Sequence, residues 1–288
     1  MIDDNSKEFI KRHIGPSYDE QSKMLRHVGY NSLEDLMKNT VPEKILLKND
    51  LKIDEPLSEN DALKKLKSIS KKNKIFRNFI GMGYYNSITP NVILRNILEN
   101  PGWYTSYTPY QPEVAQGRLE MLLNFQQTII DLTGMDIANA SLLDEATATA
   151  EAVGLSQRLD KTNAKKIFIS SNCNPQTIDL IKTRTKPFGL ELIIGDEKKE
   201  LSKINQDIIC GVLAYPGTLG EIIDPSESIS QIHKKNGKAI LICDLLSLAR
   251  LKTPAELGAD IAVGSAQRFG IPMGYGGPHA AFFATKEE

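Results

Sequence analysis

A series of short apolar runs, alternating with segments of helical spacing, occupies the second half of the chain and limits its possible folds. The runs are KIFIS (166–170), LELIIG (190–195), IICGVLAY (208–215), KAILICD (238–244), ADIAVGS (259–265) and HAAFFAT (279–285). Apolar runs of this length between turn signals are typical of strands that are buried on both faces. Strands that alternate with helices predict a mostly parallel sheet joined by right-handed crossovers. The fold class is therefore α/β.

The sequence divides into three predicted parts. Residues 1–75 are polar with apolar positions at helical spacing, which predicts a helical N-terminal arm in which Ser32 caps a short helix. Residues 76–118 crowd glycine, proline and aromatic residues together and predict a long loop segment, which either carries function or covers the edge of a core. Residues 119–288 form the predicted α/β domain. Its first helix, RLEMLLNFQQTIIDLTG, is expected to end at Gly134.

Composition excludes several classes of protein. The formal net charge of -1 provides no basic field for nucleic acid or for anionic lipid. No apolar run approaches the ~20 residues that span a bilayer, and the acidic, polar start MIDDNSKEFIKRH lacks the layout of a signal sequence. The three cysteines are widely spaced and form no CxxC motif, so neither a disulfide framework nor a metal site is expected. We expect a cytoplasmic protein.

Two segments stand where a sheet of this class binds ligands. Asp244 closes the run KAILICD, and a carboxylate at a strand end either pairs with a protonated cofactor nitrogen or caps the next turn. Hydroxyls and small residues from Ser141 to Ala152 open a helix, whose first N–H groups favour phosphate. Asp144 and Glu145 can cap this helix, but their charges oppose a phosphate. The glycine-rich loop 268–279 matches neither GxGxxG nor a P-loop.

Three stretches together resemble the N-terminal half of the glycine cleavage system P-protein family. They are FIKRHIGPS (9–17), the long stretch from FIGMGYYNSITP to LLDEATA (79–148) and ADIAVGSAQRFGIPMGYGGPHAAFFA (259–284). The resemblance implies a large domain like that of the fold type I pyridoxal-phosphate enzymes. It also implies glycine as the substrate, decarboxylation with pyridoxal phosphate, and transfer of the aminomethyl group to the lipoyl arm of H-protein.

The resemblance further implies that this half carries no Schiff-base lysine. In the family that lysine belongs to the C-terminal half or to a second subunit, in a segment resembling HKTFxIPHGGGGPG. The corresponding run here is AQRFGIPMGYGGPH, with Gln267 at the lysine position. An amide forms no imine with an aldehyde. The resemblance therefore implies that the partner half binds pyridoxal phosphate covalently. N-terminal halves of this family also continue into a smaller domain, so a fragment or a truncated chain is expected.

On this interpretation the chain contributes side chains to the pocket of its partner half that binds the cofactor and glycine. The candidates are Tyr84, Tyr85, Tyr107, Tyr110, Gln111 and Arg118. Tyrosine combines an apolar ring with a hydroxyl donor, which suits such a pocket. Asp244, Ser141 and Thr147 are then relics of a second cofactor site, or structural. Two alternatives stay open: a silent scaffold that contributes no active-site group, and an aminotransferase-like enzyme in its own right. The lack of a suitably placed lysine argues against the second.

Overall fold

The computed structural model describes residues 12–13, 15–47, 49, 51–103, 108–274 and 279–287. The chain divides into two compact units, Met1–Arg77 and Asn78–Glu288. Among the described helices, none combines the length and the apolar character required to cross a lipid bilayer.

The first unit consists of short, capped helices. They are α2 (Tyr18–His27), α3 (Leu33–Thr40) and α4 (Glu59–Ser70). The predicted cap is confirmed, because the Ser32 side chain accepts a hydrogen bond of 3.1 Å from the backbone N–H of Asp35. Within the described part of this unit Leu25 is the buried hydrophobic residue. The helices therefore leave most of their apolar side chains exposed.

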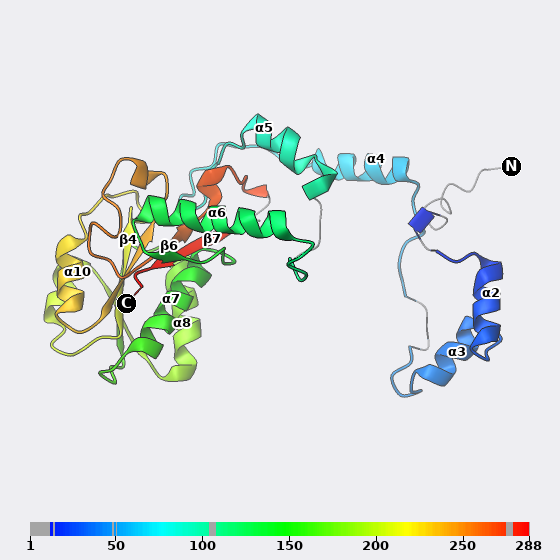
Figure 1. The fold of residues 1–288 in the computed structure, drawn as a ribbon, viewed down its shortest axis with the longest axis horizontal. Coiled ribbons are helices and arrows are strands. Elements are labelled where there is room, and N and C mark those ends of the chain that lie inside the picture. Colours follow the sequence, from blue (N-terminus) through cyan, green and yellow to red (C-terminus); the bar gives the residue numbers. More distant parts are fainter. Residues whose placement is uncertain are drawn as a thin grey trace. The chain divides into compact units, whose positions relative to one another are not determined.

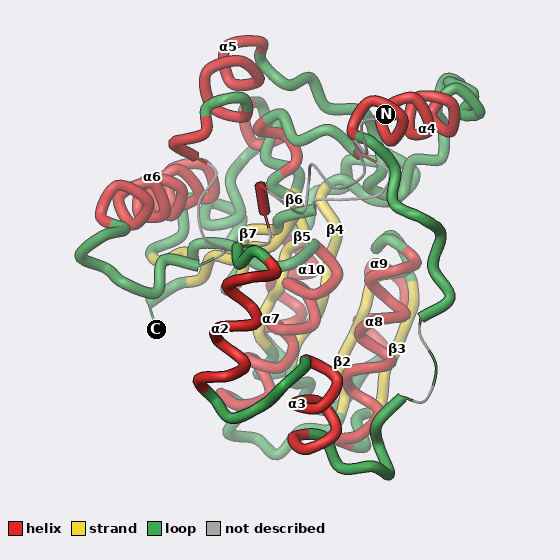
Figure 2. The backbone as a smooth tube through the Cα atoms, turned by 90° about the vertical axis from the view of Figure 1, so that its right-hand side faces the viewer, coloured by secondary structure: helices red, strands yellow, loops and turns green. Residues whose placement is uncertain are grey.

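The second unit contains one seven-stranded sheet in the order β1-β7-β6-β5-β4-β2-β3. The strands are β1 (Ile137–Ala138), β2 (Lys166–Ser170), β3 (Glu191–Gly195), β4 (Cys210–Tyr215), β5 (Lys238–Cys243), β6 (Ile261–Ser265) and β7 (Ala281–Thr285). Strands β2 to β6 run parallel, whereas β7 is antiparallel to both β6 and β1. Figure 2 shows the labelled strands β2 to β7 together as one sheet. The predicted α/β class and mostly parallel sheet are confirmed.

The described residues of the second unit form the following α-helices, of which the longer ones pack on the two faces of this sheet. They are α5 (Asn91–Ile93), α6 (Gln116–Thr133), α7 (Glu145–Leu159), α8 (Pro175–Thr185), α9 (Glu197–Glu200) and α10 (Ser226–His233). The predicted loop segment 76–118 also holds a π-helical turn, Leu94–Leu98, and a 3₁₀ turn, Pro101–Trp103. Helix α6 ends as expected, since Gly134 adopts the left-handed conformation at φ 69°.

Alternate residues of each central strand pack against opposite helix layers. Phe168 faces the core beneath α6 and α10, where it joins Ile129 and Ile232. Its neighbour Ile167 faces the core beneath α7 and α8, where it joins Ile181. In Figure 1 α6 lies along one side of the sheet, and α7 and α8 lie along the other. This double burial is why the strands read as continuous apolar runs.

Candidate functional site

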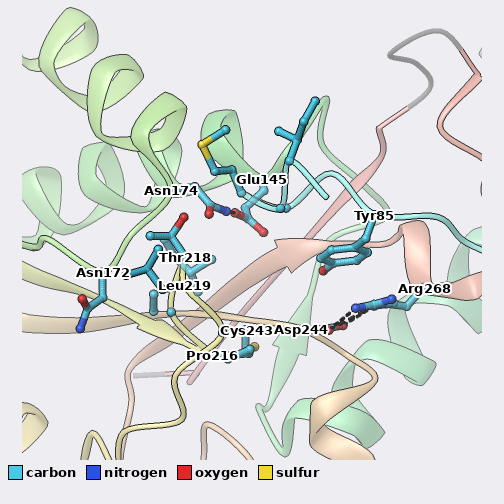
Figure 3. A pocket seen from close by; sticks show the side chains of 18 of the residues that line it. Tyr85, Glu145, Asn172, Asn174, Pro216, Thr218, Leu219, Cys243, Asp244 and Arg268 are labelled. Atoms are coloured by element: carbon cyan, nitrogen blue, oxygen red, sulfur yellow. Dashed lines mark hydrogen bonds and ion pairs between the residues drawn. The ribbon is translucent and has the colours of Figure 1, made fainter. Parts of the chain in front are cut away.

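Polar side chains line a cavity of about 530 Å³ at the ends of several strands in the second unit (Figure 3). Strands β2, β4, β5 and β6 each end at this cavity. The lining residues after those strands include Asn172, Asn174, Pro216, Thr218, Asp244 and Arg268. The strand order reverses between β2, which is followed along the chain by β3 on one side, and β4, which leads toward β5 on the other. Open α/β sheets bind ligands at such a switch point, so this cavity is the candidate site.

An ion pair between Asp244 and Arg268 forms one wall of the cavity. Arg268 Nε donates to both carboxylate oxygens of Asp244 at 2.9 and 3.1 Å, and Arg268 Nη2 donates to Oδ2 at 2.8 Å. The guanidinium carbon lies 3.7 Å from the centre of the Tyr85 ring. Figure 3 shows the three side chains together at one end of the cavity. The Asp244 carboxylate is therefore already paired with a planar cation that an aromatic ring covers.

Glu145, in the first turn of α7, forms another part of the wall. Asn174 Nδ2 donates to Glu145 Oε1 at 2.9 Å. Burial raises the pKa of the Glu145 carboxyl, and the charges of Asp244 and Asp144 raise it further, against the lowering by the Asn174 hydrogen bond. The site thus favours the neutral form of this acid more than water does.

The same helix start is already capped. The Asp144 side chain accepts a hydrogen bond of 2.7 Å from the backbone N–H of Thr147. The predicted capping of this helix is thus confirmed for Asp144. The backbone N–H that a phosphate could use at this position therefore already donates to a carboxylate.

Tyr85 is held as a neutral phenol in the cavity wall. Burial, together with the negative charge of Asp244, raises the pKa of Tyr85 to about 12, although the Arg268 charge acts in the opposite direction. Its neighbour Tyr84 lies in a separate hollow of about 480 Å³ with His279, and the two rings meet edge to face with centroids 5.3 Å apart.

The structure gathers three other predicted site residues in a different hollow. Tyr110, Gln111 and Arg118 line a depression of about 570 Å³, together with Trp103 and Val114. Tyr107, the remaining tyrosine candidate, lies outside the described residues. The predicted residues are thus distributed over separate hollows, because Tyr84 and Tyr85 face the ends of the strands and Tyr110 precedes α6.

Two of the predicted relic residues do not line the main cavity. Ser141 is exposed, and Thr147 lines a shallow depression with Phe283 and Arg158. Gln267 is 1% exposed in the turn after β6, and neither its amide nitrogen nor its amide oxygen has a hydrogen-bond partner. Asp244 is the relic candidate that the structure places in the cavity wall.

The sequence reasoning missed Arg268, Asn172 and Asn174 as cavity residues. A signal for Arg268 was available, because Arg268 and Asp244 each follow the end of a predicted strand. The carboxyl ends of adjacent parallel strands meet at one edge, which brings opposite charges there within reach. Among the described residues no group of three His, Cys, Asp or Glu side chains is placed to hold a metal ion.

Comparison with known sequences gives consistent matches. The profile of the family described as "Glycine cleavage system P-protein" matches residues 11–288. The chain is 74% identical over 288 residues to the "Glycine dehydrogenase (decarboxylating)" of Pelagibacter ubique (strain HTCC1062), covering 100% of this chain and 30% of that protein. The protein of the same name from Nostoc punctiforme is 57% identical over 280 residues, covering 97% of this chain and 28% of that protein. The chain thus spans less than a third of the length of these relatives.

Solved structures agree with the sequence matches. A crystal structure of glycine decarboxylase (P-protein) of the glycine cleavage system, in inhibitor-bound form, superimposes with a TM-score of 0.86 and 34% identity. It covers 95% of this chain, which spans 62% of that one. A complex of SepCysS with the N-terminal domain of SepCysE matches with a TM-score of 0.52 at 14% identity, a likeness of fold alone.

Proposed function

Because the chain belongs to the glycine cleavage system P-protein family, we propose that it forms the N-terminal part of a glycine dehydrogenase (aminomethyl-transferring). The whole enzyme would decarboxylate glycine with pyridoxal phosphate and pass the aminomethyl group to the lipoyl arm of H-protein. The names of the relatives and the 34% identity to a solved glycine decarboxylase support this activity. The cytoplasmic location expected from the sequence stays a prediction.

Pyridoxal phosphate does not fit the residues that line this chain's own cavity or the turn that follows β6 beside it. Gln267 is a buried amide and supplies no amine for an imine. Asp144 and Glu145 place acid groups at the start of α7, where a phosphate would need free N–H donors. We therefore assign the covalent binding of the cofactor to the C-terminal half or second subunit, and place no step of the reaction in this cavity.

The role left to this chain is to complete the partner's site and to pack against the partner. Large hydrophobic side chains between residues 79 and 123 are mostly exposed, among them Phe79 (87%), Ile88 (89%) and Val114 (82%). A soluble protein rarely leaves so many such residues uncovered along one segment. We propose that the remainder of the enzyme covers this segment.

The observation that carries the proposal is the hollow that Tyr110, Gln111 and Arg118 share within the same segment. A phenol, an amide and a guanidinium in one depression can bind a small carboxylate such as glycine, since the guanidinium matches carboxylate geometry. Tyr84 stays a candidate for the same role at its own hollow. Tyr85, by contrast, is engaged with Arg268, so we propose a structural role for it within this chain.

The test uses two single variants, Tyr110→Phe and Gln111→Ala. Each is made in the full-length enzyme and assayed with H-protein present. We expect kcat/KM for glycine decarboxylation to fall by about tenfold or more, equivalent to about 1.4 kcal/mol of lost transition-state binding, while the enzyme assembles normally. Tyr18→Phe, at an 86% exposed tyrosine of the first unit, is the matched control and should change nothing.

Assembly, measured by size-exclusion chromatography with light scattering, separates the alternatives. Variants that assemble poorly but keep normal turnover in the assembled fraction would indicate a silent scaffold. Variants with normal assembly and normal turnover would refute the contribution of this hollow.

A further inference from the structure

We propose that the Arg268 guanidinium, under the Tyr85 ring, occupies the place of a pyridoxal ring in this chain's cavity and so excludes the cofactor from it. The proposal concerns this chain's own cavity and does not depend on the role proposed for the hollow at Tyr110. Its ligand class is the pyridinium ring of pyridoxal derivatives, which we expect the native chain to reject.

The position of Asp244 is the first step of the argument. In enzymes that use pyridoxal phosphate, an acid is one of the partners of the cofactor's ring nitrogen. Asp244 directly follows β5, at the cavity between the strand ends. Both of its carboxylate oxygens accept from Arg268, at distances of 2.8 to 3.1 Å. A ring N–H that approached Asp244 would have to displace this bidentate pair.

The second step is the shape of the guanidinium group, which stands in for the pyridinium ring. Guanidinium is planar, delocalised and always charged, and its N–H groups lie in one plane, as the N–H of a pyridinium does. Tyr85 lies over the guanidinium with 3.7 Å between the guanidinium carbon and the ring centre. A planar cation that is paired in-plane with a carboxylate and covered by an aromatic ring reproduces the two contacts that a bound pyridinium would make.

The burial of the pair is the third step. The side chains of Arg268 and Asp244 are 23% and 14% exposed. Losing one partner of a pair buried to this degree leaves the other charge poorly solvated, so exchange for an incoming ligand is unfavourable. The acid groups at the start of α7 add no compensating attraction for a phosphate.

The experiment measures binding of 4-deoxypyridoxine 5′-phosphate, and of the same ring without phosphate, to the 288-residue chain by equilibrium dialysis. Both probes lack the aldehyde, so surface lysines cannot form imines with them. We expect no saturable binding to the native chain. Arg268→Ser, which frees Asp244 and leaves space for a ring, should bind the unphosphorylated ring saturably, with at least about ten times the amount bound to the native chain at the same free concentration. The phosphate should add no affinity.

Two further variants make the outcome decisive. The double variant Arg268→Ser with Asp244→Asn should lose the gained affinity, because the amide is a weaker partner for the ring N–H. Arg268→Gln keeps a polar side chain beside Asp244 that is shorter than arginine but longer than serine, and it should gain less affinity than Arg268→Ser. Thermal unfolding checks that each variant is folded. Saturable binding to the native chain would overturn the proposal by itself, even if a variant failed to fold. Equal binding by native and Arg268→Ser chains would also overturn it.

Discussion

Arg268 Nη2 lies 2.8 Å from Asp244 Oδ2, so the adjacent parallel strands β5 and β6 lead into residues of opposite charge that meet at the sheet edge. The contact joins residues 24 positions apart in the sequence. It closes one end of the cavity at the switch point of the sheet. The contribution of this ion pair to the free energy of unfolding can be measured in the absence of any ligand.

Asp244→Asn should destabilise the second unit. The amide keeps the size of the side chain, but it leaves the partly buried Arg268 without a counter-charge. We expect a loss of about 1–3 kcal/mol in the free energy of unfolding, measured with urea. Asp179→Asn, which breaks the exposed pair with Lys182 on α8, is the matched control. An exposed pair contributes little, so that variant should unfold as the native chain does. Equal effects of the two substitutions would mean that the Arg268 pair is as well solvated as a surface pair.

Gln267→Met should stabilise the chain. The Gln267 amide is buried and has no hydrogen-bond partner, so folding removes it from water without replacing its hydrogen bonds. An apolar side chain of similar length avoids that cost, and we expect a gain of about 1 kcal/mol by urea unfolding. Gln126→Met is the contrast, because Gln126 Nε2 donates to the Ala138 carbonyl at 2.8 Å and its loss should cost about 1 kcal/mol. A loss at position 267 would show that its amide does have a partner in solution.

Most of the fold could be predicted from the sequence because burial on both faces leaves a plain signal. The strand runs from residue 166 to 285 were all found, since each is a continuous apolar run between turns. Strand β1 was not predicted, because Ile137–Ala138 is too short to have a period. The antiparallel direction of β7 was not predicted either, since an apolar run carries no sign of its direction.

Less of the candidate site could be predicted, because it depends on which strands are neighbours. Asp244 was found from its place at a strand end. Its partner Arg268 was not, although it too follows a predicted strand, since the adjacency of β5 and β6 is a property of the sheet and not of either run. Ser141 and Thr147 were predicted as relics of a cofactor site, like Asp244, because hydroxyls at the start of a helix favour a phosphate. The rotation of α7 instead brings Glu145 to the cavity and turns Thr147 away from it.

Gly264→Ala should be strongly destabilising. A Cβ at this position of β6 would lie 2.1 Å from the Cys243 carbonyl oxygen and 2.7 Å from the Phe282 ring. Neither a strand backbone nor a fully buried ring can move away easily, so we expect a loss of about 3 kcal/mol in urea unfolding. Gly117→Ala is the control, because beyond its chain neighbours and the backbone of its own helix no heavy atom lies within 4 Å of the added Cβ in α6. That variant should gain roughly 0.5–1 kcal/mol from helix propensity. A tolerated alanine at 264 would contradict the packing of β7 against β6.

Glu145→Gln should alter how stability depends on pH. Burial, with the charges of Asp244 and Asp144, raises the pKa of Glu145 in the folded chain above its ordinary value of 4.5. A carboxyl whose folded pKa is raised contributes stability that is fully present below the unfolded value. That contribution is lost as the pH rises through the folded value. The amide that replaces the carboxyl in the variant stays neutral throughout, and its oxygen can still accept from Asn174. The melting temperature of the variant should therefore rise relative to that of the native chain as the pH increases from about 4 to about 8.

Glu256→Gln supplies the opposite trend within the same unit. Hydrogen bonds from the backbone N–H and the hydroxyl of Thr253 lower the pKa of Glu256, so its contribution is present above 4.5 and is lost on acidification. This variant should be less stable than the native chain at neutral pH, and the difference should shrink as the pH falls toward about 3.

If the difference in melting temperature between Glu145→Gln and the native chain stayed constant across the range, Glu145 would titrate at the same pH in the folded and unfolded chains. The carboxyl would then be solvated in the cavity, and the cavity would be open to water at its α7 end.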